Sequence, residues 1–213
     1  MLKLIKKSWN DISISDFYIL EGILTDTELN ETDKTLELVK VFTGLDDKEL
    51  LNSDLGDYNS VVAEINSIFT TNIPESANNK LDNVVLDGIK YKIVKDLDKI
   101  SVGQYLDFQT YMHQDKNMAN ILSVFLIPEG KTYGEGYSIS EFINTLNNKL
   151  NIITAKQLCN FFVKWSEKLT KRSLTYWKWK MNMMMWKMGM SKKMKKEMNS
   201  LVNNTIQTIG YIS

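Results

Sequence analysis

The stretch that decides the fold lies at residues 84–94 and reads Val84-Val85-Leu86-Asp87-Gly88-Ile89-Lys90-Tyr91-Lys92-Ile93-Val94. Asp-Gly stands between two runs of β-branched and aromatic residues, and this dipeptide suits a tight turn in which both residues adopt positive φ. The stretch therefore predicts a β-hairpin at about 82–95. A two-stranded hairpin is marginal by itself, so we expect it to lie on helices, to join another sheet, or to pair with a neighbouring subunit.

Helical patterns precede the hairpin. Ser15-Asp16 is a start signal before an apolar stripe, Glu31-Thr32-Asp33 opens a second helix, and Gly44 ends it. Residues 46–49 match the capping box, in which the first and fourth side chains each accept a backbone N–H. A further amphipathic helix is predicted from the spacing of Val61, Val62, Ile65, Ile68 and Phe69.

Further helices are predicted after the hairpin. Capping boxes at 101–104, 138–141 and 154–157 each begin one, and the apolar run 118–127 predicts another that stops at Pro128. The first of these helices and the apolar run together predict a helical hairpin, while residues 130–137 predict an exposed loop. The expected fold class is α+β and mainly helical: a small helical domain with one β-hairpin, followed by a long basic helical segment rich in Met and Trp.

Charge divides the chain into two parts. The 213 residues carry 26 basic and 26 acidic side chains, so the formal net charge is zero. Residues 1–150 hold 14 lysines against 24 acidic side chains, whereas residues 151–213 hold 12 basic side chains against two acidic ones. We therefore expect an acidic helical domain at 1–150 and a basic amphipathic helical assembly segment at 151–213.

The basic segment has an unusual composition. Eight of the eleven Met lie between residues 181 and 198, and four of the five Trp lie between 165 and 186. Read as a helix, it carries two apolar stripes about 160° apart, so both faces require a partner. The predicted assembly interface is formed by Leu174, Trp177, Trp179, Met181, Met184, Trp186 and Met188, with Lys178, Lys180 and Lys187 meeting acidic or anionic surfaces.

No residue pattern predicts catalysis, a metal site or a cofactor. Gly130-Lys131-Thr132 resembles the end of a phosphate-binding loop, but Phe125 occupies the position of the required first glycine, and residues 134–136 lack the third glycine of a dinucleotide motif. The single histidine, His113, and the single cysteine, Cys159, exclude a disulfide within the chain and metal sites built from several His and Cys ligands. We expect a buried, unreactive Cys159 and a protein that acts by binding.

Three kinds of partner suit the basic segment. The first is protein, because its lysines can pair with the acidic surface of residues 1–150 on the same or a neighbouring chain. The second is a lipid interface, where Trp lies at the headgroups and Lys reaches toward anionic lipid, although no stretch of 18 apolar residues predicts a membrane span. The third is single-stranded nucleic acid, whose phosphates attract Lys and whose bases stack on Trp and Tyr.

Several motifs in residues 9–130 resemble one family. They are Trp9-Asn10-Asp11-Ile12, Phe42-Thr43-Gly44-Leu45-Asp46, the hairpin Leu86-Asp87-Gly88-Ile89-Lys90-Tyr91, and Ser101-Val102-Gly103-Gln104-Tyr105-Leu106-Asp107. Together they are similar to tail-region virion proteins of bacteriophages, in particular those of crAss-like phages, and more loosely to tail assembly chaperones. The C-terminal segment matches no tail-chaperone pattern.

The resemblance implies a non-enzymatic protein of the tail or head–tail region. Such a protein is made in the host cytoplasm and becomes part of the virion, either as a multicopy structural component or as packaged cargo that is ejected with the genome. Its implied partners are itself and other virion proteins such as portal, ring or tail proteins, with the host membrane as a further partner on ejection. The alternatives are a membrane-active protein whose C-terminal helix inserts in a lipid interface, and a tail assembly chaperone.

Overall fold

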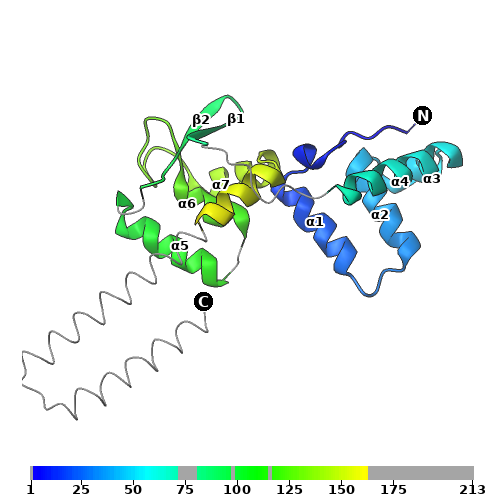
Figure 1. Ribbon diagram of the computed structural model, residues 1–213, viewed down its shortest axis with the longest axis horizontal. Helices are drawn as coiled ribbons and strands as arrows, with labels where there is room; N and C mark the ends of the chain where they lie inside the picture. Colours follow the sequence, from blue (N-terminus) through cyan, green and yellow to red (C-terminus); the bar gives the residue numbers. More distant parts are fainter. Residues whose placement is uncertain (1, 72–80, 97–98, 115–116, 163–213) are drawn as a thin grey trace, which may run out of the picture. The chain divides into compact units, whose positions relative to one another are not determined.

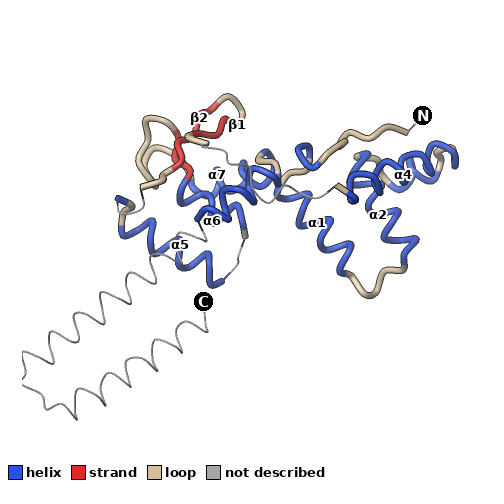
Figure 2. Tube along the Cα trace, in the orientation of Figure 1, coloured by secondary structure: helices blue, strands red, loops and turns tan. Residues whose placement is uncertain are grey.

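The computed structural model describes residues 2–71, 81–96, 99–114 and 117–162. The chain divides into two compact units, Met1–Cys159 and Asn160–Ser213, and most of the second unit lies outside the described residues. Figures 1 and 2 show helices interrupted by one small sheet, which confirms the predicted mainly helical α+β class. None of the described helices is long and apolar enough to cross a membrane.

The elements before the sheet are helical. A short 3-10 helix, η1 (Trp9–Asp11), is followed by α1 (Ile14–Thr25), α2 (Glu31–Thr43), α3 (Asp47–Leu51) and α4 (Leu55–Thr70). The capping box at Asp46 and Glu49 is confirmed, and so is Gly44, which ends α2 in the left-handed conformation at φ 72°. The predicted start of α1 was two residues late, because Ser13 is the N-cap and forms a capping box with Asp16.

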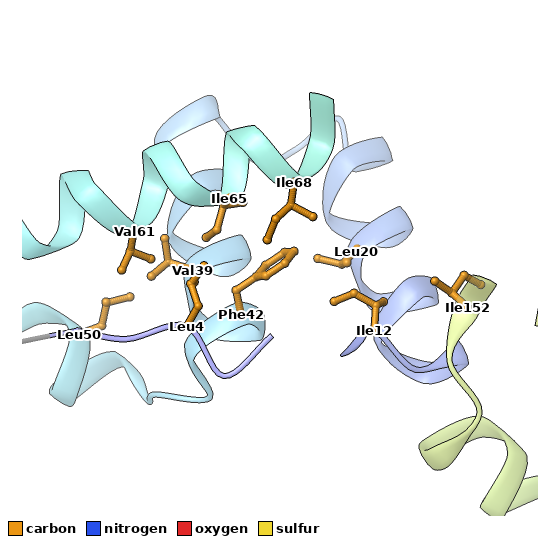
Figure 3. Close-up of a cluster of buried hydrophobic side chains, with 10 residues drawn as sticks. All are labelled: Leu4, Ile12, Leu20, Val39, Phe42, Leu50, Val61, Ile65, Ile68 and Ile152. Carbon is orange, nitrogen blue, oxygen red and sulfur yellow. The ribbon is translucent and has the colours of Figure 1, made fainter. Parts of the chain in front are cut away.

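These helices pack around Phe42, which is fully buried (Figure 3). Its ring meets the Phe69 ring edge to face, with centroids 6.0 Å apart. The Trp9 ring also meets Phe69 edge to face, with centroids 5.5 Å apart. The buried cluster around it takes residues from all four of these helices, from the N-terminal segment before them and from the chain after α7: Leu4, Ile12, Leu20, Val39, Leu50, Val61, Ile65, Ile68 and Ile152.

The sheet is built on the predicted hairpin. Strands β1 (Asn83–Leu86) and β2 (Ile89–Ile93) pair antiparallel, and Asp87 and Gly88 both have positive φ, 48° and 77°, as the turn requires. The hairpin joins a third strand, β3 (Leu126–Pro128), in the order β1-β2-β3. Of the three ways expected to support it, pairing in a larger sheet and packing on a helix are both realised within the chain.

β3 corrects one prediction. The apolar run 118–127 was expected to be helical throughout, but α6 (Met118–Phe125) ends two residues earlier. The backbone there pairs with β2 instead, since the Val94 amide donates to the Phe125 carbonyl at 2.8 Å and the Glu129 amide to the Lys90 carbonyl at 2.8 Å. Satisfying these backbone groups outweighs another turn of helix.

Helices α5 (Val102–Gln114) and α6 form the predicted helical hairpin. Phe108 of α5 and Phe125 of α6 meet edge to face, with ring centroids 5.1 Å apart. The buried side chain of Gln104 closes the predicted capping box, because its Oε1 accepts from the Ser101 amide at 2.9 Å, and its Nε2 donates to the Val124 carbonyl of α6 at 3.0 Å. One side chain therefore caps α5 and attaches it to α6.

Helix α7 (Ile139–Lys149) packs against the sheet, with Phe142 stacked on Tyr91 of β2 at 4.5 Å. Its predicted N-cap, Ser138, is confirmed. Residues 152–162 are helical, but their start was predicted three residues late, because Asn151 accepts from the Thr154 amide at 2.9 Å. The junction is attached to the start of α1, where the Ile152 amide donates to the Ile12 carbonyl at 2.8 Å.

Candidate functional site

The ten residues predicted to form the assembly interface all lie outside the described residues. They are Leu174, Trp177, Lys178, Trp179, Lys180, Met181, Met184, Trp186, Lys187 and Met188. Their role stays a prediction, and the candidate site is therefore built from the described part of the first unit.

Cys159 is buried and free, as expected from the sequence. Burial raises the pKa of its thiol to about 12, because a thiolate in an apolar environment loses its hydration. The thiolate is the nucleophilic form, so this cysteine is unreactive at neutral pH in the folded chain.

The other patterns considered from the sequence give no catalytic geometry in the described residues. Gly130 and Lys131 lie in a turn after β3 that leads to a loop, whereas a phosphate-binding loop leads directly into a helix. The side chain of His113 lies outside the described part of α5. In the described ranges no group of three or more His, Cys, Asp or Glu side chains is arranged to hold a metal ion.

The first candidate surface is the corner between α3 and α4, which we call the leucine corner (Leu51–Leu55). Leu51 and Leu55 are 75% and 71% exposed, although they lie in one of the most tightly capped parts of the chain. Asp46 caps α3 and Asp54 caps α4, where it accepts from the Gly56 amide at 2.7 Å. The caps hold the backbone of the corner, so its two leucines are presented to solvent on a fixed scaffold.

The surroundings of the leucine corner are acidic. Residues 2–71 hold 14 acidic side chains against six lysines, a net charge of −8, and five of the carboxylates lie between residues 46 and 57. Capping explains part of this, because Asp and Glu favour helix starts. The combination of exposed leucines and surrounding carboxylates favours a partner that is both apolar and basic.

The second candidate surface is a cleft of about 440 Å³ lined by the ends of β2 and β3 and the segments that follow them, which we call the lysine cleft. Residues 92–96 and Lys99 line one side, and residues 127–131 line the other. Four lysines and two carboxylates surround it, and its apolar lining includes the partly exposed side chains of Val94, Ile127 and Pro128. It is a basic site on a unit that is otherwise acidic.

The ion pairs of the lysine cleft leave two ammonium groups without a carboxylate. Lys95 pairs with Asp82 at 2.6 Å and Lys99 with Asp96 at 2.7 Å. Among the described residues no carboxylate lies within ion-pair distance of Lys92 or Lys131, which both line the cleft and are exposed. These two lysines are the groups most available to an incoming anion.

Strand alternation brings Lys92 to the cleft. Lys90 and Lys92 point to the outer face of β2, whereas Tyr91 and Ile93, which alternate with them, are buried. On the same face, Lys90 pairs at 3.1 Å with Glu129, which follows β3. The sequence signal for this exposed basic strand face is the alternation of lysines with apolar residues in Lys90-Tyr91-Lys92-Ile93.

A half-buried hydrogen bond fixes the loop that carries Lys131. The Tyr133 hydroxyl donates to Asp107 Oδ2 of α5 at 2.7 Å, so the loop predicted to be merely exposed is attached to the helical hairpin. Loss of hydration, together with this hydrogen bond, raises the pKa of Tyr133 well above its usual value. The Lys131 stem crosses over Gly136, where a Cβ atom would lie 3.1 Å from Lys131 Cδ. The exposed Lys131 side chain therefore lies along an anchored loop.

No protein-family model matches the chain, and neither a curated protein nor a solved structure matches it significantly.

Proposed function

We propose that the chain is a non-enzymatic bacteriophage virion protein of the tail or head–tail region, acting in many copies as a structural protein or as packaged cargo. The motifs in residues 9–130 that resemble tail-region proteins support the phage origin. The observation that carries the binding role is the leucine corner, where two exposed leucines are held by helix caps within an acidic surface.

The physical reason is the free energy available from covering this surface. Burying a leucine side chain stabilises a contact by about 1.5–3 kcal/mol, and rigid presentation reduces the entropy lost on binding. The carboxylates around the leucines select a basic partner rather than any apolar one. Residues 163–213 of the chain have that composition, with 11 basic and two acidic side chains among their Met and Trp residues, which supports assembly between copies.

The test is the mass of the full-length protein in solution, measured by light scattering. We expect a defined oligomer, and we expect the double substitution Leu51→Ser and Leu55→Ser to lower the mass toward that of a monomer. The matched control is Val102→Ser with Leu106→Ser on α5, because these residues are also four positions apart and are 76% and 58% exposed. A monomeric wild-type protein, or equal effects of both pairs, would contradict the proposed role of the leucine corner.

The virion location has a separate test. Mass spectrometry of purified particles of a phage that encodes the chain should detect it at many copies per particle. Detection only in infected-cell extract would contradict the virion assignment and would favour the assembly-chaperone alternative. Co-sedimentation of the full chain with anionic vesicles, but not with neutral ones, would favour the membrane-active alternative.

A further inference from the structure

We propose that the lysine cleft of one copy binds an acidic segment of a second copy, formed by the loop between α1 and α2 and the first turn of α2 (residues 26–33, which we call the acidic loop). This inference rests on the proposed assembly function and deepens it by naming one contact. The cleft and the acidic loop both lie in the described part of the first unit.

The cleft is suited to an anionic ligand. Lys92 and Lys131 have no carboxylate at ion-pair distance in the described ranges, whereas Lys95 and Lys99 are partly neutralised by Asp82 and Asp96. A carboxylate that enters the cleft is attracted by both ammonium groups. The loop that carries Lys131 is anchored by the Tyr133 hydrogen bond, so little ordering of its backbone is needed when the ligand enters.

The lining favours a protein segment over nucleic acid. The described residues around the cleft include no aromatic side chain on which a base could stack and no arginine. Val94, Ile127 and Pro128 instead offer apolar contacts between the lysines, which suit a short peptide segment that carries both carboxylates and an apolar side chain. The expected ligand is therefore an acidic surface loop.

The chain itself carries such a loop. Residues 26–33 read Asp26-Thr27-Glu28-Leu29-Asn30-Glu31-Thr32-Asp33, with four carboxylates and no basic residue. All are exposed except Leu29, which is half-buried. In the described part of the chain no cation lies within ion-pair distance of Glu28, and Glu31 has only a long 3.6 Å contact to Lys34. The loop and the lysine cleft therefore have complementary charge and comparable exposure.

The loop is also preorganised. Asp26 accepts from the Glu28 amide at 2.7 Å, and Asn30 caps α2 by accepting from the Thr32 and Asp33 amides at 3.0 and 2.9 Å. These bonds hold the turn in one conformation before binding. Because the contact joins two unlike surfaces, it can repeat from one copy to the next, as a ring or a multicopy array requires.

The test is a pair of charge reversals in the full chain, with association followed by light scattering. The cleft variant carries Lys92→Glu and Lys131→Glu, and the loop variant carries Glu28→Lys and Glu31→Lys. We expect each to weaken association by about tenfold or more, because several exposed charge pairs change from attractive to repulsive. Mixing the two variants, or combining them in one chain, should restore association.

The matched control is Lys3→Glu with Lys7→Glu, which makes the same change in net charge at two exposed lysines outside both the cleft and the leucine corner. Association should be nearly unchanged in this control. A zero-length carbodiimide cross-link provides a direct readout: in a mixture of ¹⁵N-labelled and unlabelled protein, Lys92 or Lys131 should be joined to Glu28 or Glu31 of the other isotopic copy.

The outcomes separate the two proposals. A wild-type protein that is monomeric at all concentrations would overturn both. An oligomeric wild type whose association is the same in the cleft variant would overturn only the contact with the lysine cleft. Loss of association in both variants without recovery in the mixture would also overturn it, because the cleft would then bind a different acidic group.

Discussion

Replacement of Gln104 by Glu tests how helix α5 is attached to α6. Gln104 is 5% exposed and makes two hydrogen bonds of opposite sense, accepting from the Ser101 amide and donating to the Val124 carbonyl. A carboxylate can accept the first bond as in an ordinary capping box. It cannot donate the second, so the substitution Gln104→Glu places a negative charge against a carbonyl oxygen next to the end of α6.

The size of the effect follows from these contacts. Losing the bond to Val124 costs about 1 kcal/mol, and a desolvated carboxylate facing an unpaired carbonyl adds about 1–3 kcal/mol. We expect Gln104→Glu to lower the free energy of unfolding by about 2–4 kcal/mol at pH 7. A protonated carboxyl can donate to Val124, so the protonated form is the more stable one in the folded chain.

The pH dependence has a definite sign. The introduced carboxyl has a folded pKa above its unfolded value of about 4.3, because burial and the Val124 carbonyl disfavour its charged form. The deficit relative to wild type is therefore smallest below about pH 4 and grows as pH rises through the folded pKa. Since each pKa unit corresponds to about 1.4 kcal/mol, the deficit should level off near pH 6–7.

The assay is urea unfolding of full-length wild type and variants, followed by circular dichroism at several pH values. Gln104→Met is the control, because it removes both hydrogen bonds without a titratable group and should show a deficit that does not change with pH. A Gln104→Glu variant as stable as wild type at pH 7, or one whose deficit is independent of pH, would refute this account of the α5–α6 contact.

Three further predictions concern stability and reactivity. Tyr133→Phe should lower the free energy of unfolding in urea by about 1.5–3 kcal/mol, since it removes a hydrogen bond to the Asp107 carboxylate. Because the pKa of Tyr133 is raised in the folded chain, wild type should lose this advantage as pH rises above about 10. A difference that stays constant with pH would contradict this hydrogen bond. Phe42→Ala should lower the free energy of unfolding by about 3–5 kcal/mol and Phe42→Leu by much less. Equal losses would show that the Phe42 ring is not the centre of the cluster in Figure 3. Cys159 should react with a thiol reagent far more slowly in the folded protein than in urea, and equal rates would contradict its burial.

The features that the sequence predicted correctly depend on residues close together in the chain. Ser101 with Gln104, Asp46 with Glu49, and the turn at Asp87-Gly88 were all predicted correctly, because each depends on side chains within four residues and on one backbone conformation. The starts at Ser13 and Asn151 were missed by two or three residues, since several Ser, Thr, Asp and Asn residues compete for the same cap.

The sequence by itself determined that this protein is mainly helical, where most helices begin, where the chain turns into a hairpin, and that acidic and basic charge are segregated. Those properties depend on short-range periodicity, on caps and on composition. Only the tertiary structure decided that residues 126–128 leave the helix to become β3, and that Lys92 and Lys131 line the same cleft. The physical reason is that strand pairing satisfies backbone groups more than 30 residues apart, and no local pattern records which distant segment will supply them.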